Sequence, residues 1–502
     1  MIPMHPSSWP DALPGILDRI SAEGAAVDRP RVRTPVTAYL VPADDRSAIQ
    51  FSVPVVVGRR ILEEFPLDPA GADGAVAALI EHLKQRVPQV PDMGPLAGAG
   101  TRFPGRYRDG VEPYTVIRSP SAMAEPLWKA DHRNFAGPEG LYLTLRGALP
   151  YPSPPHQEGI RQVTEWLEAL LAATAREVFH ASPAPLEEEW RNSLDQKVLR
   201  DALPGLGLVS FLGDGALPAR GFTHYRCFPR VAGPKEGVSV PFRCPPELGP
   251  VEVELSASGG TITGLGIRRR EVMAITGSNA EGKSTLLSAV WCGQDDHLRG
   301  DGREQIVTVP NVATVEAGCQ GLFLADVSLF FRRLPPGLSG TPTAVSGQGS
   351  ASLVMAQQLQ RAVRVGAPLC LFDEDRSAPN LLVPSCVQGD EVMVLSRILA
   401  SQRDAMGDTA LLFAAGALDI LVARADRILL LEGHAAHAMN PSEFRRRLRG
   451  HLADVMESLR ADAVEEQDAV DLKSGVTTCR LSSWGEGPGG GSPPSRSHPD
   501  EG

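Results

Sequence analysis

The second half of the chain alternates short, nearly continuous apolar runs with stretches of helical periodicity. The apolar runs lie at residues 272–276, 368–372, 409–415 and 427–431. Runs of this kind are typical of strands buried on both faces, as in a parallel sheet that helices cover from two sides. The pattern therefore predicts an α/β core with a doubly covered parallel sheet.

A smaller β-structure is predicted directly before this core. Strand-like runs at residues 251–255 and 261–267 are separated by the turn sequence at residues 258–260, which favours a hairpin. Upstream, a helix-like stretch at residues 195–200 leads into a strand that ends in a turn at residues 207–218. We therefore expect a β-subdomain next to the α/β core.

The first 245 residues predict a separate, divergent α+β domain. Residues 49–57 favour a strand, and Pro54 within it indicates an edge strand or a bulge. Residues 75–86 and 159–181 carry apolar side chains at helical spacing, a pattern more typical of core packing than of a ligand site. Residues 87–119 are rich in proline and glycine, which predicts a loop.

The end of the chain predicts a helix followed by a tail. Apolar residues recur at helical spacing within residues 444–472, which we expect to form a helical segment that closes the fold. The Gly/Ser/Pro-rich stretch from residue 474 predicts disorder. The predicted domains are therefore residues 1–245, 246–440, 441–473 and the disordered tail 474–502.

Composition agrees with this organisation. The chain has 502 residues, of which 42% are hydrophobic and 22% charged, and its 44 prolines and 50 glycines indicate long loops beside folded cores. The net charge of -11 argues against a uniformly basic surface, although it leaves a local basic patch open.

The cysteines and the apolar runs bear on the compartment. The seven cysteines form no C-x-x-C pair, and their odd number and irregular spacing favour core thiols in a reducing compartment over a disulfide framework. The first residues lack the pattern of a secretory signal, and no apolar run has the length of a membrane span. We expect a soluble intracellular protein without a membrane span, in the cytoplasm or an organelle, with a mitochondrial location left open.

A phosphate-binding loop is the clearest chemical signal. Residues 277–284 fit G-x-x-x-x-G-K-[ST] between a predicted strand and a predicted helix, a context that makes a chance match less credible. Backbone N–H groups of such a loop converge on phosphates, Lys283 would reach the β- and γ-phosphates, and Ser284 would ligate Mg2+. The residues expected to bind ATP here are Gly277, Ser278, Asn279, Ala280, Glu281, Gly282, Lys283, Ser284 and Thr285.

Two acids follow the apolar run at residues 368–372. Asp373 is expected to hold Mg2+, and Glu374 is expected to deprotonate the attacking water, so that Glu374 and Lys283 form the catalytic pair. The start of a capped helix would look the same, but the phosphate loop upstream favours the catalytic interpretation.

Residues 373–380 resemble the Walker B and D-loop run of ABC-class ATPases, and residues 346–350 resemble a variant of the ABC signature motif. We expect the latter segment to open a helix, where Ser346, Gly347 and Gly349 would form a second anion site. The resemblance implies that this site closes on ATP held by another subunit, which means a homodimer with composite sites. The alternative is an ordinary Gly/Ser loop.

More specifically, the chain resembles the predicted ATPases of the ABC class, a family that includes a kinetoplastid mitochondrial RNA-editing-associated protein. The resemblance covers roughly residues 195–435, and the N-terminal part matches poorly, although residues 207–220 look like the family's domain junction. It rests on the phosphate loop and on residues 259–267, 300–304, 346–350 and 373–380.

The chain also departs from related patterns. No histidine follows the run at residues 409–415, where transporter-type ABC enzymes place a switch histidine, and residues 279–281 replace the family's usual loop residues. Slow turnover is therefore expected. Gln305 and Gln320 are both candidates for the Q-loop glutamine.

The sequence thus predicts a P-loop NTPase with an ABC-ATPase-like core that binds ATP and Mg2+ and hydrolyses ATP in a homodimer. The alternative is an ATP-gated module that binds RNA or another nucleic acid through the arginines at residues 268–270, 332–333 and 445–449. Those arginines equally fit a solvated surface, and no aromatic residues interleave with them to stack on bases.

Overall fold

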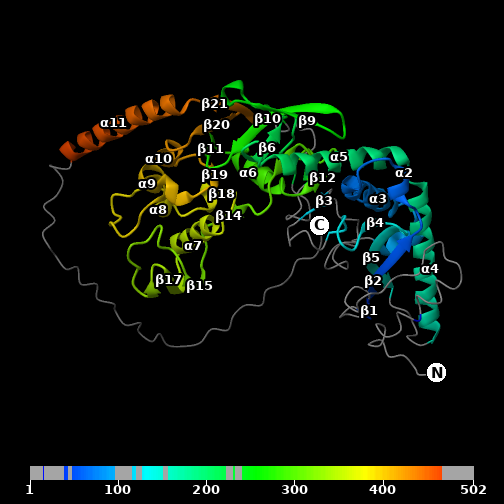
Figure 1. Cartoon of the computed structure of the whole chain (residues 1–502). Helices are drawn as coiled ribbons and strands as arrows, with labels where there is room; N and C mark the ends of the chain where they lie inside the picture. Colours follow the sequence, from blue (N-terminus) through cyan, green and yellow to red (C-terminus); the bar gives the residue numbers. More distant parts are fainter. Residues whose placement is uncertain are drawn as a thin grey trace, which may run out of the picture. The chain divides into compact units, whose positions relative to one another are not determined.

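The computed structural model describes residues 15, 39–42, 48–96, 116–119, 127–150, 157–221, 230–231 and 240–465 (Figure 1). The chain divides into two compact units, Met1–Arg446 and Arg447–Gly502, which are described separately. The predicted tail at 474–502, the segment beyond residue 465 and the loop residues 97–115 lie outside the described part.

A six-stranded sheet forms the centre of the nucleotide-binding core. Its strand order is β14-β18-β19-β11-β20-β21, and all neighbours are parallel except the edge pair β20 and β21. The strands are β14 (Ala313–Thr314), β18 (Leu369–Asp373), β19 (Ala410–Ala414), β11 (Val272–Gly277), β20 (Arg427–Glu432) and β21 (Ala435–Met439). The predicted parallel sheet is confirmed.

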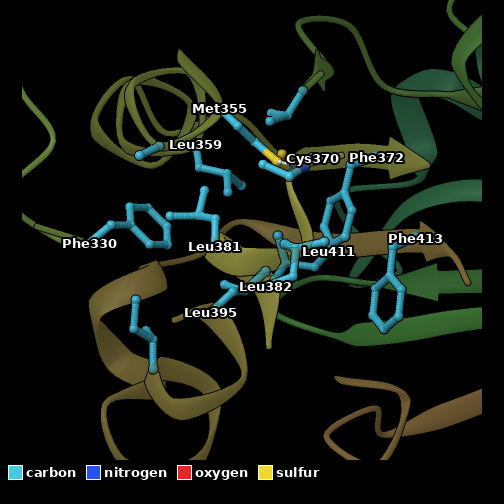
Figure 2. Packing of buried hydrophobic residues seen from close by; sticks show 14 of the residues in the cluster. Phe330, Met355, Leu359, Cys370, Phe372, Leu381, Leu382, Leu395, Leu411 and Phe413 are labelled. Carbon is cyan, nitrogen blue, oxygen red and sulfur yellow. Dashed lines mark hydrogen bonds between the residues drawn. The ribbon is translucent and has the colours of Figure 1, made fainter. Parts of the chain in front are cut away.

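Two hydrophobic clusters share the residues of this sheet. On one face, side chains from β18 and β19 pack with α7 (Ala351–Arg364), α8 (Pro379–Leu382) and α9 (Leu395–Ser401), as Figure 2 shows for Met355, Leu381 and Cys370. The rings of Phe372 and Phe413 stack there at a centroid distance of 5.2 Å. The other cluster includes residues of α6 (Lys283–Cys292), so apolar side chains are buried on both faces of the sheet, as its continuous apolar strands predict.

The predicted β-subdomain is an antiparallel sheet with strand order β13-β6-β10-β9. Its strands are β13 (Ile306–Thr308), β6 (Leu208–Gly213), β10 (Gly260–Arg268) and β9 (Val251–Leu255). The hairpin of β9 and β10 is confirmed. Because β6 precedes residue 245, the chain before that point contributes a strand to the sheet of the ATPase core, and the boundary at residue 245 stays a prediction.

The N-terminal region has its own sheet and hydrophobic cluster. The sheet order is β1-β2-β5-β4, and α3, α4 and α5 contribute to the cluster. Strand β1 pairs with residues 49–52 of β2, and β5 pairs with β2 from Ala48 to Val57 without a register shift. Strand β2 therefore lies inside the sheet and has no bulge against β5, and an edge position at Pro54 stays a prediction. The elements are β1 (Tyr39–Pro42), β2 (Ala48–Val57), β5 (Gly140–Pro150), β4 (Phe135–Gly137), α3 (Ala72–Arg86), α4 (Gln157–His180) and α5 (Pro183–Ala202).

Shorter elements connect these layers. They are α2 (Ile61–Glu64), β3 (Val116–Arg118), β7 (Arg220–Gly221), β8 (Arg230–Val231), β12 (Asp296–His297), α10 (Asp419–Val422) and the 3-10 helices η2 (Pro69–Gly71), η3 (Pro91–Leu96), η6 (Pro246–Leu248) and η8 (Arg403–Met406). Strand β12 pairs with β3, which joins the core to the N-terminal region.

The last helix, α11 (Pro441–Glu465), confirms the helix predicted near the C-terminus. Phe444 in its first turn packs on the cluster of the central sheet. Leu452, Val455, Met456 and Leu459 of this helix lie in the second unit and are 43%, 39%, 58% and 62% exposed, and the expectation that the segment closes the fold stays a prediction.

Candidate nucleotide-binding site

The phosphate loop lies between β11 and α6, in the predicted order of strand, loop and helix. Gly277, Ala280 and Gly282 have φ angles of +142°, +64° and +98°. A side chain on Gly277 would lie 2.3 Å from the carbonyl oxygen of Leu431, so glycine is required there. The backbone conformation is therefore that of a loop whose N–H groups can converge on an anion.

Lys283 is the first residue of α6 and is folded back over the loop. Its Nζ donates hydrogen bonds to the carbonyl oxygens of Gly277 and Ser278, each at 2.8 Å. The ammonium group is thus held beside the loop by weak neutral acceptors, which phosphate oxygens can replace with charge-assisted bonds.

The acids Asp373 and Glu374 lie at the end of β18. Asp373 ends the strand and Glu374 begins the 3-10 helix η7 (Glu374–Arg376). Glu374 Oε2 accepts hydrogen bonds from the backbone N–H groups of Gly416 and Ala417, the latter at 2.9 Å. Backbone amides after β19 therefore hold Glu374 at the position where the sequence lacks a histidine.

These groups line one cleft of about 650 Å³. A methyl group placed on Gly416 would lie 3.6 Å from Lys283 Nζ and 3.7 Å from Glu374 Oε2, which shows how closely the loop and the acids approach. The residues that line the cleft are Gly277, Ser278, Asn279, Ala280, Glu281, Gly282, Lys283, Ser284, Thr285, Asp373, Glu374, Asp375, Gly416 and Ala417. The structure thus brings together every residue expected in the phosphate loop and both predicted acids.

The donor set fits Mg2+. Ser284 and Asp373 line the same cleft and offer a hydroxyl and a carboxylate oxygen. Across the described residues, no group of three His, Cys, Asp or Glu side chains forms a metal cage. Mg2+ commonly takes one or two protein oxygens and completes its octahedron with phosphates and water, so a nucleotide would supply the remaining ligands.

An apolar pocket of about 160 Å³ adjoins the phosphate loop. Its walls include Pro218, Val240, Phe242 and Leu431, and it shares residues 280–282 with the phosphate cleft. The sequence reasoning missed this pocket, because its walls come from four separate stretches of chain, and the three besides the phosphate loop carry no motif.

Glu281 has a structural partner beside this pocket. Its Oε2 accepts a hydrogen bond from the backbone N–H of His434 at 2.8 Å, and its carbonyl oxygen lies 3.3 Å from His434 Nδ1. Glu281, one of the loop residues that departs from the family pattern, therefore ties the phosphate loop to the turn between β20 and β21.

A further cleft of about 530 Å³ shares Ser284 and Asp373 with the phosphate cleft. Glu316, just after β14, lines it and accepts a hydrogen bond from Arg376 at 2.8 Å. Neither Q-loop candidate lines any of these three clefts: Gln305 bonds to Gly213 in the β-subdomain, and Gln320 begins β15. Sequence reasoning missed Glu316 because β14 is too short to recognise as a strand.

The segment at residues 346–350 differs from the expectation. It lies mostly in β17 (Ala344–Gly349), which pairs with β15 (Gln320–Ala325) and β16 (Ser339–Thr341), and α7 begins only at Ala351. The segment does lead directly into a helix, as expected. The expectation that Ser346, Gly347 and Gly349 lie at the helix N-terminus is wrong, because they are paired in a sheet, and Ser346 Oγ accepts a bond from Leu324 N–H at 3.0 Å. Ser350 occupies the N-cap position of α7, with no side-chain hydrogen bond to the helix.

The far end of α6 is fixed by charged side chains. Arg200 of α5 donates to Asp296 at 2.5 Å and to the carbonyl oxygens of Gly293 and Asp295, each at 3.2 Å. Burial raises the pKa of the neighbouring Asp295 to about 6. The helix that carries Lys283 is therefore clamped at its C-terminal end to a helix that also packs in the N-terminal cluster.

Several arginines predicted as nucleic-acid contacts pair with aspartates. Arg269 bonds to Asp408 at 2.5 Å, Arg270 to Asp404 at 3.0 Å and Arg333 to Asp390 at 3.0 Å. Arg445 of the last cluster donates to the carbonyl oxygen of Ala423 at 3.3 Å. The first two clusters thus carry counter-charges beside them, which weakens their attraction for phosphates.

The loop, the two acids and the parallel sheet define a P-loop nucleotide-binding protein. The chain belongs to the ABC_ATPase family, whose P-loop domain model matches residues 182–464. A similar protein is the uncharacterized MJ1628 of Methanocaldococcus jannaschii, which is 39% identical over 381 residues, spanning 75% of this chain and 82% of the relative.

Solved ABC proteins are also similar to parts of the chain. CbiO1 of Clostridium perfringens, part of the transporter complex cbiONQ, is 17% identical, with 43% of this chain and 96% of that chain covered and a TM-score of 0.27. A bacterial Atm1-family exporter with ATP bound is 15% identical, with 63% and 52% covered and the same TM-score. Within the described part of the chain, no helix is long and apolar enough to cross a membrane.

Proposed function

We propose that the protein binds ATP with Mg2+ over the phosphate loop and hydrolyses it. The observation that carries this proposal is the meeting of Lys283, Ser284, Asp373 and Glu374 in one cleft. A phosphate cradle, a metal-binding oxygen pair and a general base are the parts that phosphoryl transfer to water requires.

The phosphate cleft and the apolar pocket would bind different parts of ATP. The loop amides and Lys283 take the phosphates, while the apolar pocket with Phe242 and Pro218 accepts the base. The two clefts share residues 280–282, so one nucleotide can occupy both. An apolar, largely pre-formed wall beside a few placed polar groups is typical of small-molecule sites.

Hydrolysis assigns a role to each acid. Ser284 and Asp373 would hold Mg2+, which would supply positive charge to neutralise the phosphates. Glu374, fixed through Oε2 by the N–H groups of Gly416 and Ala417, accepts the proton of the attacking water on Oε1. Backbone amides replace a titratable switch residue here, and we infer slow turnover from that substitution.

The same proposal includes a composite site, which means a nucleotide site that a second subunit completes. In a homodimer, the N-terminus of α7 would face the γ-phosphate held by Lys283 of the other subunit, since helix N–H groups favour an anion. The predicted contacts Ser346, Gly347 and Gly349 precede that helix in β17, and Ser350 occupies its N-cap position. We therefore place the closest γ-phosphate contact at Ser350, with Gly349 beside it.

The experiment that tests the proposal measures ATP binding and phosphate release with Mg2+ and with EDTA. Wild type should bind and hydrolyse ATP only with Mg2+, whereas Asp373→Asn should lose the Mg2+ dependence of binding. Glu432→Gln, which changes an exposed acid at the end of β20, serves as the matched control and should behave as wild type. A folded wild-type protein that does not bind ATP would refute the proposal.

Nucleic-acid binding stays a prediction of the sequence. The aspartate partners of Arg269, Arg270 and Arg333 give it no support. We therefore do not propose it as the function.

A further inference from the structure

Helix α11 carries exposed apolar side chains along one side of its second half. Leu452, Val455, Met456 and Leu459 are between 39% and 62% exposed, and they recur with Leu448 at a spacing of three and four residues. Residues at that spacing lie on one side of a helix. The stripe spans about three turns, or ~18 Å along the helix.

The same helix is charged oppositely in its two halves. The first half, from Pro441 to His451, has four arginines against one glutamate, which gives +3. The second half, from Leu452 to Glu465, has four acids against one arginine, which gives -3. The charged residues are Glu443, Arg445, Arg446, Arg447 and Arg449 in the first half, and Asp454, Glu457, Arg460, Asp462 and Glu465 in the second.

We propose that α11 pairs in antiparallel orientation with α11 of a second copy of this chain. Antiparallel pairing places each basic half opposite an acidic half, and two-fold symmetry satisfies both contacts at once. With the axis near residues 453–454, Leu452 lies opposite Val455 of the partner and Leu448 opposite Leu459. Parallel pairing would instead place the arginines of one helix against those of the other.

The charge pattern of α11 favours a second copy of this chain as its partner over a nucleic acid or a membrane. A nucleic acid or an anionic membrane would attract the arginines at residues 445–449 but would be repelled by the acids of the second half. A nucleic acid would also leave the apolar stripe uncovered. A stripe of this length makes a small interface, so the association is weak and concentration-dependent.

The first test is sedimentation of the full chain over a concentration series without nucleotide, which separates this interface from ATP-driven dimerisation. Wild type should self-associate, and Leu452→Asp should stay monomeric at every concentration. Ser458→Asp adds the same charge off the apolar face, level with Arg449 of the partner subunit, and should self-associate like wild type. A monomeric wild type, or a Leu452→Asp variant that associates equally well, would overturn the proposal.

The second test reverses the charges. Replacing Arg446, Arg447 and Arg449 by Glu makes the helix acidic throughout, and replacing Asp454, Glu457 and Asp462 by Lys makes it basic throughout. Each variant alone should be monomeric, whereas an equimolar mixture should form a heterodimer. A mixture that stays monomeric would overturn the charge argument, and so would a monomeric wild type that binds an RNA oligonucleotide through these arginines.

Orientation is tested with cysteines in a chain whose Cys227, Cys319, Cys386 and Cys479 are changed to Ser, since Cys319 and Cys386 are exposed and the other two lie outside the described residues. A mixture of Leu448→Cys and Leu459→Cys proteins should form a disulfide-linked pair under mild oxidation. Leu459→Cys alone should not, because antiparallel helices keep the two sulfurs ~16 Å apart along the axis. Efficient linkage of Leu459→Cys to itself would show a parallel pair and overturn the proposal.

Discussion

Two glycine- and serine-rich segments precede helices in this chain, and they take different conformations. The phosphate loop at residues 277–282 is an unpaired turn after Gly277, with positive φ angles at three positions. Residues 346–349 are instead a strand, held between two neighbours in an antiparallel sheet. The first segment lines a cleft, whereas the backbone of the second is hydrogen-bonded in the sheet.

The difference shows which residues of a motif allow its conformation to be predicted. Glycine and serine are compatible with loops, caps and strands alike, so their presence at residues 346–350 does not decide among them. The phosphate loop adds a lysine at the start of a helix and an apolar strand before it, and few other structures meet all those conditions. Four predictions test this difference between the two segments, and they are given from the largest expected effect to the smallest.

Glu374→Gln should lower ATP turnover about 100- to 10,000-fold, the range that a general base contributes. The amide side chain can still accept the bonds from Gly416 and Ala417, so ATP binding should persist. Phosphate release and nucleotide affinity, measured on one preparation, distinguish these effects. Unchanged turnover would remove Glu374 as the base and leave the cleft as a binding site alone.

Lys283→Ala should weaken ATP binding about 10- to 100-fold, because bonds to charged groups contribute about 1.5–3 kcal/mol each. The fold should persist, since the bonds that Lys283 makes go to carbonyl groups of an exposed loop. Titration with a fluorescent nucleotide measures the affinity, and circular dichroism checks the fold. If a folded Lys283→Ala variant bound ATP as tightly as wild type, Lys283 would have no role in binding phosphate, and the assignment of residues 277–282 as a phosphate loop would be wrong.

The fold of the core was predictable from sequence because its strands are buried on both faces. Continuous apolar runs located β18, β19 and β20, and their helical connections implied a parallel order. By contrast, β14 has two residues, and β16 (Ser339–Thr341) has three exposed ones, so neither leaves a hydrophobic pattern. Periodicity also located α11 correctly but could not tell whether its apolar face meets its own core or a partner.

The site was predictable where one motif holds several functional groups. The phosphate loop and the two acids met as expected, since β18, β19 and β11 are neighbours and end at one edge of the sheet. The bonds that orient Glu374 come from backbone N–H groups of Gly416 and Ala417, which no side-chain pattern records. Glu316 and Phe242 reach their clefts through tertiary contacts between distant segments, which spacing does not encode.

Ser350→Glu tests whether the end of β17 serves a partner's nucleotide. A carboxylate at the cap of α7 would oppose the γ-phosphate, so the rise in mass that ATP-Mg2+ induces should be lost. The affinity of each chain for ATP should stay within about two-fold of wild type, since Lys283 and Asp373 are untouched. Sedimentation with and without nucleotide, in the Leu452→Asp background, isolates the ATP-driven step. ATP-driven dimerisation that survives in Ser350→Glu would refute the composite site at α7.

Ser346→Ala should have the smallest effect, and it should act on stability. The hydroxyl of Ser346 accepts the N–H of Leu324, a residue with a φ of +48° in an irregular part of β15. Losing that exposed bond should lower the free energy of unfolding by about 0.5–1 kcal/mol, as measured by urea denaturation. ATP binding and ATP-driven dimerisation should remain at wild-type levels, because the serine at the N-cap position of α7 is Ser350. Loss of ATP-driven dimerisation in a stably folded Ser346→Ala variant would instead make Ser346 the contact with the partner's nucleotide, and the strand would then have to open when ATP binds.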